Sequence, residues 1–148
     1  METVTRTTDA PSGLWPPSVN FHLWKPCNMR CRFCFATFED IPPEVLPEGH
    51  LPREEAIRLV GVLSRAFEKI TFAGGEPTLC PWLVELIAVA KGEGCTTMLV
   101  TNASRLDELL PRLGGRLDWL VLSVDSASQE THAALGRQTV TGPLETAR

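Results

Sequence analysis

Cys27, Cys31 and Cys34 are spaced as Cys-x3-Cys-x2-Cys within one short stretch of the chain. Thiolates are soft ligands, so cysteines this close together can converge on one metal centre. An iron–sulfur cube takes four thiolates, and a loop that offers three leaves one iron without a protein ligand. An open metal position lets a substrate or cofactor bind the metal directly. The spacing therefore favours a reactive metal centre at this loop.

Two other interpretations of the loop stay open. A structural zinc site would need a fourth ligand, for which His22 is the nearest candidate. Zinc sites usually pair two Cys-x2-Cys knuckles, or one knuckle with a pair of histidines, and neither pattern is present. The cysteines could instead be buried apolar fillers, but the Pro, Asn, Met and Arg residues around them make a poor core segment.

The rest of the chain alternates between predicted strands and predicted helices. We expect strands over residues 19–24, 69–72, 96–101 and 119–123, and helices beginning at 52 and 81, over 105–113 and within 125–135. The proline-rich residues 38–50 read as a loop. Alternation of this kind predicts an α/β fold with a parallel sheet and right-handed crossovers. The continuously apolar runs 98–100 and 120–122 predict strands that are covered on both faces.

Glycines and short polar residues gather at the predicted ends of these strands. The cysteine loop follows the first strand, and the residues that follow the others include Gly74, Gly75, Glu76, Thr101, Asn102, Ser104, Ser123, Asp125 and Ser126. Each has an ordinary explanation, because Gly-Gly makes tight turns and short polar side chains cap helices. Ligands of parallel sheets bind at the carboxyl ends of the strands. The convergence therefore predicts a binding site more strongly than any single motif does.

Composition limits the classes of function. A chain of 148 residues with 43% hydrophobic residues has the length of one domain, and we expect a folded core over 18–148 after a disordered lead-in at 1–17. The net charge of −4 gives no support to nucleic-acid binding, and no apolar run is long enough to span a membrane. Five cysteines, three of them in one loop, are not a disulfide framework, which favours a reducing cytoplasmic location.

With Phe33 before its last cysteine, the loop resembles that of the radical S-adenosylmethionine (SAM) enzymes. The flanking Asn20, His22 and Phe35 resemble the viperin family in its prokaryotic form, and this resemblance extends over residues 19–137. It implies a partial (β/α)6 radical SAM barrel with about four βα units, a 4Fe–4S cluster on the three cysteines, and SAM as a cofactor. Because the chain ends before the remaining units, we expect it to be the N-terminal part of a longer enzyme.

The resemblance also implies roles for individual residues. The implied contacts to SAM are made by Gly74, Gly75, Glu76, Asn102, Ser123 and Arg137. Among these, Glu76 would bind the ammonium group and Arg137 would pair with the carboxylate. The implied contacts to a nucleoside triphosphate are made by Asn20, His22 and Lys69. Ordinary explanations remain for these residues too: a solvated arginine at a helix end, a core histidine and an exposed lysine at a strand start. Two departures from the family pattern are Ala73, where serine is common, and Ala103, where glycine is common.

The function implied is reductive cleavage of SAM to a 5′-deoxyadenosyl radical. In a viperin-like enzyme the radical converts a ribonucleoside triphosphate to its 3′-deoxy-3′,4′-didehydro form, which implies antiviral defence. An electron donor such as a flavodoxin or ferredoxin would be a partner. The alternatives are a radical SAM peptide-maturation or activating enzyme, and an inactive truncated fragment that binds a cluster or nothing.

Overall fold

The computed structural model describes residues 17–36, 44 and 46–137. The lead-in predicted at 1–17 lies outside these residues apart from Pro17. The carbonyl oxygen of Pro17 accepts backbone hydrogen bonds from Glu68 and Lys69 at 2.9 and 3.1 Å. Part of the loop predicted over 38–50, and the end of the chain after Arg137, also lie outside the described residues.

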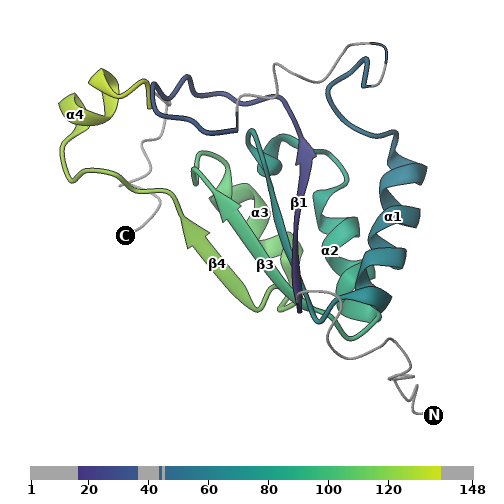
Figure 1. The fold of residues 1–148 in the computed structure, drawn as a ribbon. Helices are drawn as coiled ribbons and strands as arrows, with labels where there is room; N and C mark the ends of the chain where they lie inside the picture. The colour runs from purple at the N-terminus through teal and green to yellow at the C-terminus, as the bar shows by residue number, and fades with distance from the viewer. Residues whose placement is uncertain (1–16, 37–43, 45, 138–148) are drawn as a thin grey trace.

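Four parallel strands form one sheet whose spatial order follows the chain. The strands are β1 (Ser18–Trp24), β2 (Lys69–Gly74), β3 (Thr96–Thr101) and β4 (Trp119–Leu122). The helices are α1 (Arg53–Ala66), α2 (Leu83–Gly92), α3 (Leu106–Leu113) and α4 (Gln129–Ala134). A helix lies between each strand and the next, as Figure 1 shows. The predicted α/β fold with a parallel sheet is confirmed.

The connection from β2 to α2 differs from the prediction. A short 3-10 helix, η1 (Pro77–Leu79), follows β2, and α2 begins at Leu83 rather than at Pro81. Proline favours the first turn of any helix, and here Pro77 begins the 3-10 helix while Pro81 lies just before α2. The side chain of Glu76 caps η1 by accepting a hydrogen bond from the backbone N–H of Thr78 at 3.0 Å.

Helices α1, α2 and α3 pack against one face of the sheet (Figure 1). Ile70, Phe72 and Leu99 point from the sheet into this layer and are fully buried. The expectation of strands covered on both faces was wrong for β4, because Trp119 and Val121 are 63% and 38% exposed. An apolar run indicates that a strand can be buried, but it does not supply the second layer that would bury it.

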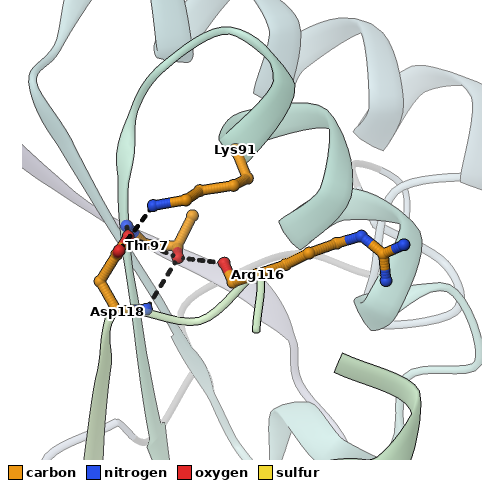
Figure 2. A network of polar contacts seen from close by, with 4 residues as sticks. All are labelled: Lys91, Thr97, Arg116 and Asp118. Carbon is orange, nitrogen blue, oxygen red and sulfur yellow. Dashed lines mark hydrogen bonds and ion pairs between the residues drawn. The ribbon is translucent and has the colours of Figure 1, made fainter. Parts of the chain in front are cut away.

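A polar network fixes the opposite end of the sheet, where β3 and β4 begin. The Asp118 carboxylate accepts hydrogen bonds from the backbone N–H of Thr97 at 2.8 Å and from Lys91 Nζ at 2.5 Å. The Thr97 hydroxyl lies 2.6 Å from the carbonyl oxygen of Arg116, which closes the network in Figure 2. The hydrogen bonds to Asp118 lower the pKa of its carboxyl, with Lys91 the largest cause and Thr97 next. This network sets the register of β4 against β3, away from the predicted site.

Across the described ranges, no helix has both the length and the apolar character needed to cross a membrane.

Candidate cofactor site

A cavity opens at the carboxyl ends of the strands, with about 700 Å³ of space that is partly continuous with solvent. It is lined by the three cysteines, by all six predicted SAM contacts and by His22. These residues come from segments more than 100 positions apart in the chain, from His22 to Arg137. Of the predicted site residues, Asn20 and Lys69 do not line it.

The cysteine loop is anchored on one side by the turn that follows β2. The N–H of Gly75 donates to Trp24 O at 2.6 Å, and the N–H of Glu76 donates to Pro26 O at 2.9 Å. A Cβ on Gly75 would lie 2.2 Å from Lys25 O, which is an impossible contact. The Gly-Gly pair therefore lets two backbone segments touch, in addition to lining the cavity.

The other side of the loop is anchored by the residues after α4. The N–H of Arg30 donates to Gly136 O at 3.0 Å, and the N–H of Arg32 donates to Leu135 O at 3.1 Å. Gly136 has a φ of +82°, and a Cβ there would lie 2.0 Å from Arg30 O. The loop is thus held between two distant turns, each of which needs a glycine.

All three cysteines line the wall of the cavity. Burial raises the pKa of Cys27, and the charges of Glu76, Cys31 and Cys34 raise it further, while a hydrogen bond from the Met29 N–H at 3.4 Å opposes the rise. Burial also raises the pKa of Cys31, against the opposing charge of Arg137. Cys27 and Cys31 are half-buried and both have a raised pKa, so a positive centre would be needed for the two thiols to ionise together.

Three exposed or half-buried thiols on one loop fit an iron–sulfur cluster, because each would ligate a different iron. Within the described residues, no three His, Cys, Asp or Glu side chains are grouped to hold a single metal ion. Cys80 and Cys95 are buried elsewhere, in the core between the sheet and its helices. Burial raises the pKa of Cys80 to about 11, as expected of an inert core thiol.

Glu76 lies at the back of the cavity and is 1% exposed. Its Oε1 accepts hydrogen bonds from the Thr78 N–H at 3.0 Å and from the hydroxyls of Thr78 and Thr101 at 2.6 Å each. Its Oε2 accepts from the Asn102 N–H at 2.8 Å. A carboxylate has about four acceptor positions, and most of them are filled from within the chain. In this structure Glu76 ties the end of β3 to the turn after β2, and its contact to the SAM ammonium group stays a prediction.

Arg137 is 8% exposed and lies beneath the cysteine loop. Its Nη1 donates to Ser123 O at 3.0 Å, and its guanidinium lies 5.6 Å from the centre of the Phe33 ring. Its Nε forms an ion pair with Asp125, although the angle is not that of a hydrogen bond. The cation predicted to meet the SAM carboxylate is therefore in the cavity, oriented by an acidic neighbour.

The predicted triphosphate contacts are separated along the sheet. The register pairs Asn20 with Thr71 and His22 with Ala73, so Asn20, His22 and Lys69 share one face. His22 lies at the cavity, with its ring edge-on to Phe35 at 6.5 Å. Lys69 starts β2, four residues before Ala73, which places it about 13 Å further down the strand. Roles for these three residues stay predictions.

Two residues that the sequence did not single out belong to the site's support. Thr78 supplies two of the donors to Glu76. Asn28, between the first two cysteines, exchanges side-chain hydrogen bonds with Asn102 and Ser104 at the end of β3. A short amide inside a ligand loop was the available signal for Asn28, whereas nothing in the sequence indicated that Thr78 would face a carboxylate.

Known proteins share this chain's sequence over most of its length. It is 57% identical over 123 residues to the S-adenosylmethionine-dependent nucleotide dehydratase of Lacinutrix mariniflava, covering 82% of this chain and 26% of that protein. The protein of the same name from Flammeovirga pacifica is 54% identical over 125 residues, covering 83% of this chain and 43% of that protein. The S-adenosylmethionine-dependent nucleotide dehydratase RSAD2 of Danio rerio is 37% identical over 129 residues, covering 82% of this chain and 34% of that protein. The chain thus spans less than half the length of these curated relatives.

A solved structure of TYW1 with a lysine-pyruvate adduct bound has the same fold, with a TM-score of 0.51 at 23% identity. The match covers 80% of this chain and 45% of that one. Residues 24–148 match the family model of the radical SAM superfamily. This range begins at the last residue of β1 and includes the cysteine loop and the carboxyl ends of all four strands. With this match, the shared fold and the three-cysteine cavity, the chain belongs to the radical SAM superfamily.

Proposed function

We propose that this chain carries the cofactor-binding part of a viperin-like nucleotide dehydratase. Cys27, Cys31 and Cys34 would hold a 4Fe–4S cluster, and SAM would lie in the cavity beside it. The observation that carries the proposal is the cavity itself, where the three thiols meet the six residues implied as SAM contacts. High identity to proteins named nucleotide dehydratases supports the substrate class.

In this proposal, residues that line the cavity would position SAM. Arg137 offers a guanidinium fork that suits a carboxylate, and its buried position strengthens the pairing. The turn at Gly74 and Gly75 packs against the backbone at the start of the cysteine loop and lines the cavity beside it. Asn102 and Ser123 supply short polar groups at neighbouring strand ends. When bound, the cluster would pass one electron to the SAM sulfonium, which releases methionine and a 5′-deoxyadenosyl radical.

The proposed substrate is a ribonucleoside triphosphate. It would lose its 4′-hydrogen to the radical, and then its 3′-hydroxyl as water with one further electron and a proton. The product would be the 3′-deoxy-3′,4′-didehydro nucleotide, with a role in antiviral defence. A cytoplasmic flavodoxin or ferredoxin would supply the electrons. Relatives with the dehydratase name support this choice over a peptide-maturation enzyme.

The first experiment tests the three-cysteine ligand set. After anaerobic reconstitution, the wild-type chain should bind about four irons and four sulfides, and Cys31→Ala should lose most of them. Cys80→Ala is the matched control, because Cys80 is a buried core thiol away from the cavity. The reduced wild-type protein should then convert SAM to 5′-deoxyadenosine.

A full cluster in Cys31→Ala would show that the three-cysteine ligand set is wrong. Failure of the reconstituted wild-type protein to bind SAM would count against the whole proposal. Turnover of triphosphates should be measured on the natural protein that contains this chain. Release of 5′-deoxyadenosine that no added ribonucleoside triphosphate stimulates would favour a different substrate class.

A further inference from the structure

Asn28 directly follows the first cysteine of the loop and does not line the cavity. Its side chain crosses from the loop to the end of β3, 74 residues further along the chain. Its Oδ1 accepts from Asn102 Nδ2 at 2.9 Å, and its Nδ2 donates to the Ser104 hydroxyl at 2.8 Å. Both polar atoms of the Asn28 amide are therefore hydrogen-bonded to the same turn, the one that follows β3.

The orientation of these amides is fixed by the backbone. The N–H of Ser104 can only donate, and it donates to Asn102 Oδ1 at 2.9 Å. Asn102 must therefore present its Nδ2 to Asn28, and Asn28 must accept through its Oδ1. The remaining Nδ2 of Asn28 then donates to Ser104. Each side chain has one arrangement that satisfies all of these contacts.

The chain of hydrogen bonds continues to the turn after β2. The backbone N–H of Asn102 donates to Glu76, whose own N–H donates to Pro26 O, beside Cys27. The contacts form a closed circuit from the cysteine loop to the end of β3, then to the Gly-Gly-Glu turn, and back to the loop. Asn28 is the side chain that joins the loop to β3 in this circuit.

We propose that Asn28 is a positioning residue that sets where Cys27 lies relative to the SAM-binding turns. It acts through Asn102 and Ser104 and not by contact with the cofactor. This inference rests on the proposed function, because it concerns how the same cavity holds a cluster and SAM in register. Without the tie, the loop keeps its three cysteines and its backbone anchors but loses its fixed distance from the end of β3.

The first test needs no cofactor. In the apo chain, Asn28→Ala should speed amide hydrogen exchange in residues 25–31 and 102–104 by roughly tenfold, because losing about one hydrogen bond shifts the opening equilibrium by that factor. Exchange in the buried centre of β2 should stay unchanged. Arg32→Gln is the control, since it changes an exposed side chain in the same loop. Exchange in Asn28→Ala that matches the wild type would overturn the proposal.

The second test separates positioning from simple support of the fold. After reconstitution, Asn28→Ala should retain its irons but bind SAM about tenfold more weakly per cluster. SAM should also change the electron paramagnetic resonance signal of its reduced cluster less than in the wild type. Asn28→Asp should restore both properties, because its second oxygen can accept from the Ser104 hydroxyl. Ser104→Ala should show a smaller defect in the same direction.

The outcomes distinguish the inference from the function on which it rests. If Asn28→Ala loses cluster but the remaining clusters bind SAM normally, Asn28 only supports the fold and the proposal is wrong. The same holds if Asn28→Asp is as impaired as Asn28→Ala. If the wild type binds neither cluster nor SAM, the proposed function itself fails, and it fails independently of any variant.

Discussion

Replacing Glu76 with glutamine should destabilise the chain by removing one acceptor from a buried network. The amide oxygen can occupy the Oε1 position and keep the three donors from Thr78 and Thr101. The amide nitrogen then faces the Asn102 N–H, so two donors meet where a hydrogen bond of 2.8 Å stood. A buried N–H left without an acceptor costs about 1–3 kcal/mol.

The loss of charge has two opposing effects. Hydrogen bonds to an ion are about twice as strong as neutral ones, so the three remaining bonds weaken. Removing a buried charge also relieves a desolvation cost. We expect a net loss of about 2–3 kcal/mol in the free energy of unfolding, a large share of the roughly 5–15 kcal/mol that a domain has.

Urea denaturation of the apo chain measures this loss. Thr78→Val removes one hydroxyl donor at nearly constant volume and should cost about 1 kcal/mol. Glu55→Gln is the control for charge removal, because Glu55 is exposed in the first turn of α1 and should change stability by a few tenths of a kcal/mol. An unfolding free energy for Glu76→Gln within about 0.5 kcal/mol of the wild type would refute the role of Glu76 as a tie between strand ends.

Two further predictions concern the other supports of the sheet and the loop. Gly136→Ala should lower stability by at least about 1–2 kcal/mol and reduce iron content after reconstitution, because a left-handed residue gains a Cβ against Arg30 O. Gly92→Ala is the control and should be neutral or stabilising, because a Cβ at Gly92 meets nothing within 4 Å. Equal effects of the two substitutions would contradict the steric argument. Asp118→Asn should cost about 1 kcal/mol at pH 7, through its exposed ion pair and its bond to Thr97. Because the folded-state pKa of Asp118 is lowered, this contribution is fully present above about pH 4 and is lost as pH falls through the folded pKa. Denaturation curves of the wild type and Asp118→Asn should therefore converge in acid. A stability difference that persists there would show that the charge of Asp118 is not the cause.

The sequence by itself determined the elements and the end of the sheet at which the site lies. Alternating apolar strands and amphipathic helices have one common solution, a parallel sheet, and parallel strands place all their carboxyl ends on one edge. The three cysteines and the residues Gly74 to Glu76 could therefore be placed together from the sequence alone. Local chemistry was enough here, because ligand spacing within a loop does not depend on distant contacts.

Only the tertiary structure decided what those residues do within the fold. Close backbone contacts between distant segments leave no room for a Cβ at three glycines: Gly74 lies against Trp24 O, Gly75 against Lys25 O, and Gly136 against Arg30 O. Glu76 accepts hydrogen bonds from Thr78, Thr101 and Asn102, and the sequence placed Thr101 and Asn102 at the same edge of the sheet without showing that they pair with this carboxylate. The role of Asn28 depends on its hydrogen bonds to Asn102 and Ser104, which lie more than 70 positions away in the chain. Hydrogen-bond partners across strand ends depend on register and loop path, and these are fixed by packing that no local pattern records.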